Sequence, residues 1–282
     1  MPVTHASHRL DSGKAPRMTS SRSKPGAKIE RPAPLRHAHS HDYSRLLKRW
    51  RAAAPKAGLA VEVFAEAVGL PLIHLHSRKS PPDAPSVYLS AGIHGDEPAS
   101  TEALLTWVER NSEIARRLKL RIFPCLNPWG LIHNKRSNAD GLDLNRCYHD
   151  RSTPIVAKHR QLVLQSRYDL ALILHEDYDA LGAYLYETSP AKPHWGEQII
   201  AAMSPHLPPD SRRRIDTSRA KDGIIRRKIT SDTMPEWPEA FLLHFHGAVR
   251  VFTIETASEF HIDSRVEAHV AAIDAAIALL ID

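Results

Sequence analysis

The spacing of hydrophobic and polar positions changes at about residue 42. Beyond that point apolar residues recur every three to four positions in some segments and every second position in others. These two periods are typical of half-buried helices and of strands, respectively. They predict helices over residues 43–53, 97–117, 154–166 and 261–281, and strands over residues 60–68, 71–77, 86–91, 119–125, 168–174 and 249–254.

The order of these elements predicts the class of fold. Helices alternate with apolar strands and no internal repeat is present. Such alternation favours a sheet that is covered by helices. We therefore expect residues 42–282 to form a single α/β domain with a mixed, largely parallel sheet and helices on both faces.

Residues 1–41 have a different composition, rich in Ser, Pro and His. Residues 1–40 hold eight Lys or Arg against two acidic residues, which accounts for the whole formal net charge of +6. So few apolar residues cannot offset the entropy lost on ordering the segment. We predict a disordered basic arm, and we favour a solubilising tail or a true start at Met18 over a specific nucleic-acid partner.

Length and composition exclude several other classes of protein. A chain of 282 residues suits one large domain. No apolar stretch approaches the roughly 18 residues of a membrane-spanning helix. Cys125 and Cys147 are too few for a disulfide framework, and the N-terminus lacks the apolar segment of a secretory signal. We expect a cytoplasmic protein without a membrane partner, and the sequence does not predict its oligomeric state.

Candidate functional residues follow the predicted strands of the domain. His94 and Glu97 come after strand 86–91, His175 ends strand 168–174, and Glu255 ends strand 249–254. Ligands of open α/β sheets bind beyond the carboxyl ends of strands. Two histidines and a carboxylate are a common ligand set for catalytic zinc.

The pattern His-x-x-Glu is weak on its own, because it occurs again at His194 and Glu197. That second pair follows a proline and is interpreted as structural. His94 instead lies in a glycine-flanked turn after a buried strand, which favours metal ligation over a structural hydrogen bond. His133 and His149 compete as third ligand, but only His175 follows an apolar strand that would hold it rigidly.

The loop that starts at residue 127 adds a longer motif. It contains Arg136-x-Asn-x-x-Gly-x-Asp143-x-Asn145-Arg146 between the His94 and His175 positions. With Glu255, this order resembles the zinc carboxypeptidases of the M14 type and their relatives. These relatives include murein-peptide amidases and the succinylglutamate desuccinylase and aspartoacylase group. The resemblance spans about residues 60–280.

The resemblance implies a cofactor and a set of roles. It implies one zinc ion per chain, an oriented first histidine, an oxyanion-stabilising arginine, a pair that grips a substrate carboxylate, and a general base. The corresponding residues are His94, Glu97 and His175 for zinc, Asp143 for orientation, Arg136 for the oxyanion, Asn145 and Arg146 for the carboxylate, and Glu255 for the base.

Two departures narrow the resemblance. The mobile-loop tyrosine of digestive carboxypeptidases has no counterpart, because the last tyrosines are Tyr184 and Tyr186. The further β domain of aspartoacylase-type enzymes is also not expected, since 27 residues follow Glu255. The murein-peptide amidases then fit best, with a short peptide or wall fragment as substrate and amide hydrolysis as reaction. An N-acyl-amino-acid deacylase is the alternative, and a non-catalytic zinc-binding homologue is disfavoured.

Two segments between the third ligand and the base remain open. Residues 176–187 carry acids that could recognise an amine or face solvent. His244 and His246 alternate as on a strand, and one of them could replace the absent tyrosine.

Overall fold

The computed structural model describes residues 37–149, 153–226, 228–230, 232 and 236–281. The chain divides into two compact units, residues 1–34 and 35–282, and the first unit lies outside the described residues. Residues 1–36 of the predicted arm therefore lie outside the described residues, and residues 37–41 lie within them. Those five residues form turns, in which His37 Nδ1 lies 3.1 Å from Glu102 Oε2 and the His41 ring is 2.7 Å from the Leu131 carbonyl oxygen. They are part of the folded unit.

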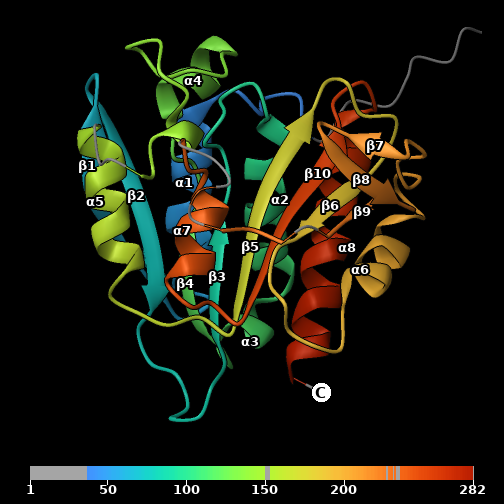
Figure 1. The fold of residues 1–282 in the computed structure, drawn as a ribbon. Coiled ribbons are helices and arrows are strands. Elements are labelled where there is room, and N and C mark those ends of the chain that lie inside the picture. Colours follow the sequence, from blue (N-terminus) through green and yellow to red (C-terminus); the bar gives the residue numbers. More distant parts are fainter. Residues whose placement is uncertain (1–36, 150–152, 227, 231, 233–235, 282) are drawn as a thin grey trace, which may run out of the picture. The chain divides into compact units, whose positions relative to one another are not determined.

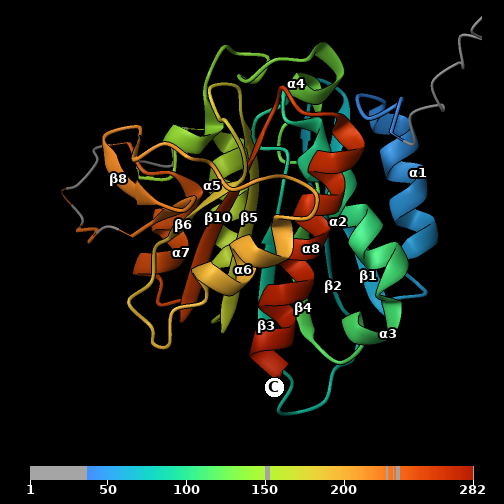
Figure 2. The same ribbon diagram turned by 90° about the vertical axis from the view of Figure 1, so that its right-hand side faces the viewer.

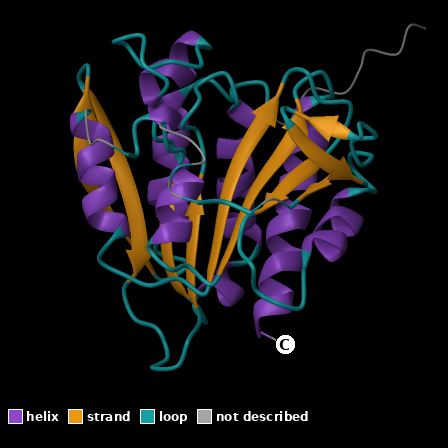
Figure 3. Cartoon of the chain, in the orientation of Figure 1, coloured by secondary structure: helices purple, strands orange, loops and turns teal. Residues whose placement is uncertain are grey.

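The described residues form helices and strands in an alternating order (Figure 3). The helices are α1 (Tyr43–Ala53), α2 (Pro98–Arg110), α3 (Ser112–Ala115), α4 (Pro128–His133), α5 (Pro154–Val163), α6 (Gly196–Met203), α7 (Glu239–Phe245) and α8 (Ile262–Ile281), with a 3₁₀ turn at Leu144–Arg146. The strands are β1 (Leu59–Ala67), β2 (Leu70–Ser77), β3 (Ser86–Ser90), β4 (Lys119–Phe123), β5 (Leu170–Asp177), β6 (Tyr184–Glu187), β7 (Arg214–Ile215), β8 (Ser218–Lys221), β9 (Ile224–Ile225) and β10 (Arg250–Ala257).

Local sequence signals set the starts of several helices. The Asp42 carboxylate accepts a hydrogen bond from the Arg45 amide at 2.9 Å and caps α1. Thr153 caps α5 in the same way, and Pro154 follows at the first helical position. Such caps satisfy amides that have no partner within the helix.

The ten strands form one mixed sheet in the order β1-β2-β4-β3-β5-β10-β6-β9-β8-β7 (Figure 1). The central strands β4, β3, β5 and β10 are parallel to one another. The hairpin β1–β2 and strand β6 join this centre in antiparallel pairings. The sheet is mixed as predicted, and its longest parallel run lies at the centre, where β5 and β10 carry His175 and Glu255.

Helices cover both faces of the sheet, which confirms the predicted layers (Figure 2). One face packs against α1, α2, α6 and α8, with Trp50, Trp107 and Ile273 fully buried there. The other face packs against α5 and α7 around Tyr88, Phe123 and Leu243. Among the described helices, none is both long enough and apolar enough to cross a bilayer.

The segment with His244 and His246 is a helix, so the expectation of a strand there is wrong. Helix α7 ends at Phe245, and the amide of its C-cap residue His246 donates to the Leu242 carbonyl at 2.9 Å. The apolar residues Phe241, Leu242 and Leu243 are buried together. Contiguous apolar residues of this kind suit a short buried helix as well as a strand, which is why the alternation of the two histidines was misleading.

A buried polar chain crosses the face that α5 and α7 cover. His159 Nδ1 lies 2.7 Å from the Tyr148 hydroxyl and its Nε2 lies 2.8 Å from the Tyr88 hydroxyl. The Tyr88 hydroxyl in turn donates to the Glu239 carboxyl group. Burial lowers the pKa of His159 to about 3, so the folded protein holds this imidazole neutral.

This histidine predicts a specific acid sensitivity. The pKa of His159 is lower in the folded chain than in the unfolded chain, so below about pH 6.5 the unfolded state binds the extra proton. Stability should therefore fall with decreasing pH, with about 1.4 kcal/mol per pH unit from this residue. In His159→Gln, the slope of unfolding free energy between pH 6 and 4.5 should be smaller by about that amount, measured by urea unfolding. The exposed-site control His206→Gln should keep the original slope.

Candidate active site

The turn between β3 and α2 depends on two glycines. Gly92 has a φ of +63°, where other residues are strained, and a Cβ at Gly95 would lie 1.9 Å from the Gly130 carbonyl carbon. The chain therefore passes directly over α4, and the Gly95 amide donates to the Lys135 carbonyl at 3.0 Å. This close approach fixes the turn that carries His94 and leads into Glu97 at the start of α2.

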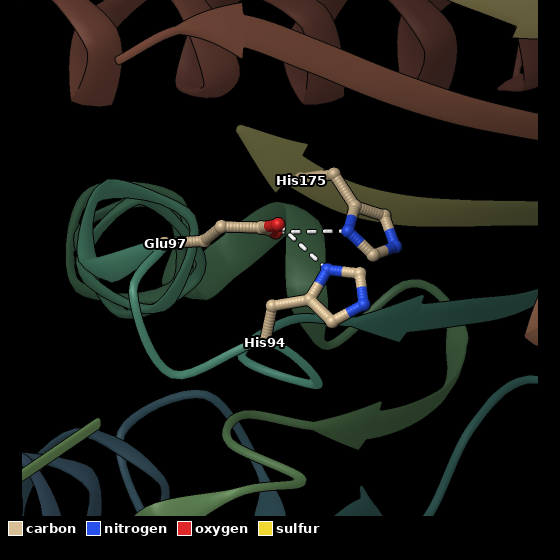
Figure 4. A group of neighbouring side chains, drawn as sticks. All are labelled: His94, Glu97 and His175. Carbon is tan, nitrogen blue, oxygen red and sulfur yellow. Dashed lines mark hydrogen bonds and ion pairs between the residues drawn. The ribbon is translucent and has the colours of Figure 1, made fainter. Parts of the chain in front are cut away.

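His94, Glu97 and His175 meet in one buried group (Figure 4). The Nδ1 atom of His94 lies 2.6 Å from one Glu97 carboxylate oxygen, and the Nδ1 atom of His175 lies 2.8 Å from the other. One ligand atom from each residue falls within 4.8 Å of the others. The predicted ligand set is thus brought together from a turn, a helix start and strand β5.

Asp143 and Arg136 hold the outer side of His94. The Asp143 carboxylate lies 3.0 Å from His94 Nε2, and its other oxygen accepts two bonds from Arg136 at 3.1 and 3.0 Å. Burial favours neutral Asp143, but the hydrogen bond to His94 and the Arg136 guanidinium keep its pKa below the usual range. Asp143 therefore leaves Nδ1 of His94 directed at Glu97, and the orienting role that the resemblance implies for it stays a prediction.

Asn145 contacts His175, the other histidine. Its amide nitrogen lies 3.4 Å from His175 Nε2, and its amide oxygen accepts from the Glu239 backbone at 2.8 Å. The side chain of Asn145 is thus engaged on both ends, at 8% exposure. Its role in gripping a substrate carboxylate stays a prediction, while the neighbouring Arg146 lines the cavity.

Glu176 connects two of the ligand-bearing elements. Its carboxylate accepts a 2.6 Å hydrogen bond from the Ala99 amide in the first turn of α2, and it pairs with Arg265 of α8. Glu176 follows His175 in β5, and Ala99 lies two residues after Glu97. The hydrogen bond between Glu176 and Ala99 thus fixes the distance between His175 and Glu97. Sequence reasoning left this residue unassigned, because its partners are distant along the chain.

Glu255 lies beside the third ligand. Strands β10 and β5 are parallel, and Glu255 and His175 are paired in register. Burial raises the pKa of Glu255 to about 8, and the Glu97 carboxylate adds to this while His175 opposes it. A carboxylate held beside the His94–Glu97–His175 group is placed to exchange a proton with a molecule in the cavity.

The group opens into a cavity of about 610 Å³. His94, Glu97 and His175 line it together with Arg136, Arg146 and Glu255. Beyond Glu255 the walls come from β6, α7 and the β7–β8 turn, through Tyr186, Phe241 and Thr217. The cavity therefore extends well past the metal-binding group.

The competing histidines take other contacts. His133 stacks on Trp129 with ring centroids 4.2 Å apart, and His149 packs on Trp237. His194 Nδ1 lies 3.3 Å from Glu187, and Glu197 pairs with Arg226. Within the described ranges, His94, Glu97 and His175 form the one group with metal-ligand geometry.

The donor set fits a divalent metal ion. Two imidazole nitrogens and a carboxylate converge, both histidines contact a polar group on the opposite ring nitrogen, and the cavity side leaves room for a water or substrate oxygen. This combination matches catalytic rather than structural metal sites, which use four protein ligands.

Fold and site together define a chain with the metallo-carboxypeptidase fold and a buried metal-binding group. The family described as the succinylglutamate desuccinylase/aspartoacylase catalytic domain matches residues 83–209, which include the three ligands and Asp143. The predicted resemblance to zinc carboxypeptidases and this related group is therefore confirmed.

Individual relatives agree with this class. A candidate metallopeptidase of Shewanella amazonensis has a TM-score of 0.77 and 23% identity, covering 86% of this chain and 94% of its own. A metallo-carboxypeptidase of Pseudomonas aeruginosa, in complex with (2-guanidinoethylmercapto)succinic acid, has a TM-score of 0.63 and 18% identity over 85% and 70% of the two chains. Carboxypeptidase SOL1 of Arabidopsis thaliana is 30% identical over 126 residues, which is 40% of this chain. The chain spans about a quarter (26%) of that relative's length.

The ligand assignment predicts the effect of removing one histidine. His175→Ala should lose most of the bound metal, because one of three protein ligands is removed, and should lose activity with it. His133→Ala, a matched control, should keep both. Elemental analysis of the purified proteins measures the metal, and full occupancy in His175→Ala with loss in His133→Ala would contradict the assignment.

Proposed function

We propose that the protein is a zinc-dependent hydrolase, with one Zn²⁺ per chain, that cleaves an amide bond beside a free carboxylate. The favoured substrate is a short peptide or peptidoglycan-derived fragment, as in the murein-peptide amidases. The observation that carries the proposal is the position of Glu255. It shares one cavity with the His94–Glu97–His175 group and with Arg136, so ligands, base and oxyanion donor surround one reacting bond.

The steps follow from the positions of these side chains. A zinc ion held by His94, Glu97 and His175 would supply Lewis acidity at this place. Glu255 accepts the proton of the attacking water and passes it to the leaving nitrogen. Its fixed position beside His175 suits both transfers, because the carboxylate can hold the proton between them.

Arg136 supports the charge that develops on the carbonyl oxygen. Its guanidinium is held by two hydrogen bonds to Asp143 and lies 3.7 Å from Glu97, so it is placed before substrate arrives. A preorganised cation at this position stabilises the transition state without further reorganisation.

The distribution of charge in the cavity supports a peptide as substrate. Three lining carboxylates, those of Glu176, Asp177 and Glu187, are paired with Arg265, Arg212 and Arg226. The lining residues Asp96, Asp179 and Asp216 have no Lys or Arg within 4.0 Å among the described residues. These carboxylates favour an acyl side that carries an amino group over one that is purely anionic, whereas Arg146 offers one place for a carboxylate.

The second candidate is an N-acyl-amino-acid deacylase. The match of residues 83–209 to the succinylglutamate desuccinylase/aspartoacylase catalytic domain favours it. Both candidates require a carboxylate on the leaving amino acid, so they differ on the acyl side. We favour the peptide, and we further propose a cytoplasmic location and no specific nucleic-acid partner.

The proposed base predicts the behaviour of a conservative variant. Glu255→Gln keeps the size of the side chain and removes its proton transfer, so turnover should fall by about 10²–10⁴. Metal content should remain, since Glu255 is not a ligand. Glu259→Gln, the same change at an exposed position four residues later, should leave turnover within about twofold. Near-normal turnover in Glu255→Gln would refute the mechanism.

The proposed contact with the substrate carboxylate predicts different kinetic effects for the variants of two arginines. Arg146→Ala should weaken substrate binding by about 2–5 kcal/mol, since a charge-assisted contact is lost, while Arg136→Ala should mainly lower kcat. Amidating the leaving amino acid should reproduce the Arg146→Ala loss, and combining the two should add little. Lys135→Ala, an exposed neighbour, is the control. Equal rates on free and amidated substrates, or a strong preference for simple N-acyl amino acids over peptides, would reject the amidase proposal.

A further inference from the structure

A second cavity lies at the opposite end of the sheet from the active site. It has a volume of about 440 Å³ and is lined where β2 ends and where β3, β4 and β5 begin. This is the lower end of the sheet in Figure 1, next to the loop that joins β2 to β3. The lining residues are His76, Ser77, Ser80, Ser86, Lys119, Leu120, Arg121, Ser166, Arg167 and Tyr168.

The lining of this cavity is cationic. It contains Lys119, Arg121 and Arg167, four serines and a histidine, and no Asp or Glu. The active-site cavity has the reverse polarity, with eight carboxylates and two arginines among its lining residues. The second cavity therefore attracts anions, and the sign of the lining charges distinguishes it from the active-site cavity.

The two arginines of the second cavity are not neutralised by acidic partners. Among the residues that the structure describes, neither Arg121 nor Arg167 has a carboxylate oxygen within 4.0 Å. The nearby Asp169 carboxylate instead accepts from the Ser86 amide at 2.8 Å, and Glu62 is engaged by His74 and His76. Arginines outside ion pairs retain their full fork of donors for a ligand.

Arg121 is held at a fixed place within this lining. It pairs in register with His76 of β2 and Tyr88 of β3, and it is partly buried between these strands. Its charge acts on its surroundings, because it adds to burial in lowering the pKa of His74. A cation on a strand, with little conformational freedom to lose, is a better anchor than one on a mobile loop.

We propose that this cavity is a binding site for a phosphate-bearing small molecule, anchored through its phosphate group by Arg121, Arg167 and Lys119. Three cations match a dianion better than a single carboxylate, and the hydroxyls of Ser80 and Ser86 can donate to the remaining phosphate oxygens. The volume is within the range of small-ligand sites. The site is independent of the proposed hydrolase activity, because it shares no residue with the active-site cavity.

Calorimetric titration of the metal-loaded full chain tests this proposal, with inorganic phosphate and glycerol 3-phosphate as separate probes at constant ionic strength. We expect saturable binding of one equivalent. Tighter binding of glycerol 3-phosphate would identify an ester as the source, and tighter binding of inorganic phosphate would identify the free anion. Arg121→Gln and Arg167→Gln should each weaken binding at least tenfold, and Arg121→Lys should weaken it less.

Two controls separate the site from other causes. Arg45→Gln removes an exposed arginine of α1 and should not change binding. Arg146→Gln removes an active-site arginine and should not change it either, so loss in this variant alone would place the anion in the active site and overturn the proposal. Absence of saturable binding, or equal binding by Arg167→Gln, would also overturn it. Arg167 is exposed, so its variant tests the site even if Arg121→Gln does not fold.

Discussion

The carboxylate of Glu97 is the interaction on which the site depends. It is 2% exposed and lies between His94 and His175, so three segments that are distant in sequence must meet at two oxygen atoms. A buried carboxylate is costly unless it is paired or bound to a metal. The neighbouring contacts follow from this requirement. Asp143 fixes one imidazole, Asn145 contacts the other, and Glu176 ties β5 to the helix that Glu97 begins.

The parallel centre of the sheet holds the candidate base beside this group. His175 and Glu255 are paired across β5 and β10, so the candidate base is fixed relative to a metal ligand by backbone hydrogen bonds. His94 follows the adjacent strand β3 on the other side of β5. Three neighbouring strands therefore deliver three functional side chains to the same edge, which is the general reason for sites at the carboxyl ends of such strands.

Much of this arrangement could be predicted from the sequence. Apolar periodicity located the helices and strands of the sheet centre, and the spacing of His94, Glu97 and His175 after those strands indicated the group that they form. The missed features lack a local signal. Glu176 contacts Ala99 and Arg265, which are 77 and 89 residues away. The short strands β7 and β9 have two residues each, too few for a periodic pattern. Helix α7 and a strand were indistinguishable in a brief apolar run.

The pairing of charges links these observations to specificity. Where the fold needs a buried carboxylate, an arginine or a histidine stands beside it, as with Glu176 and Glu97. Some charges without such partners line a cavity, with Asp216 in one and Arg121 in the other. The charges of a structural ion pair already stabilise each other. An unpaired charge at a concave surface is therefore stabilised more strongly by a bound ligand of opposite sign. The charges of the two cavities are therefore the feature from which we infer the ligands that each would favour.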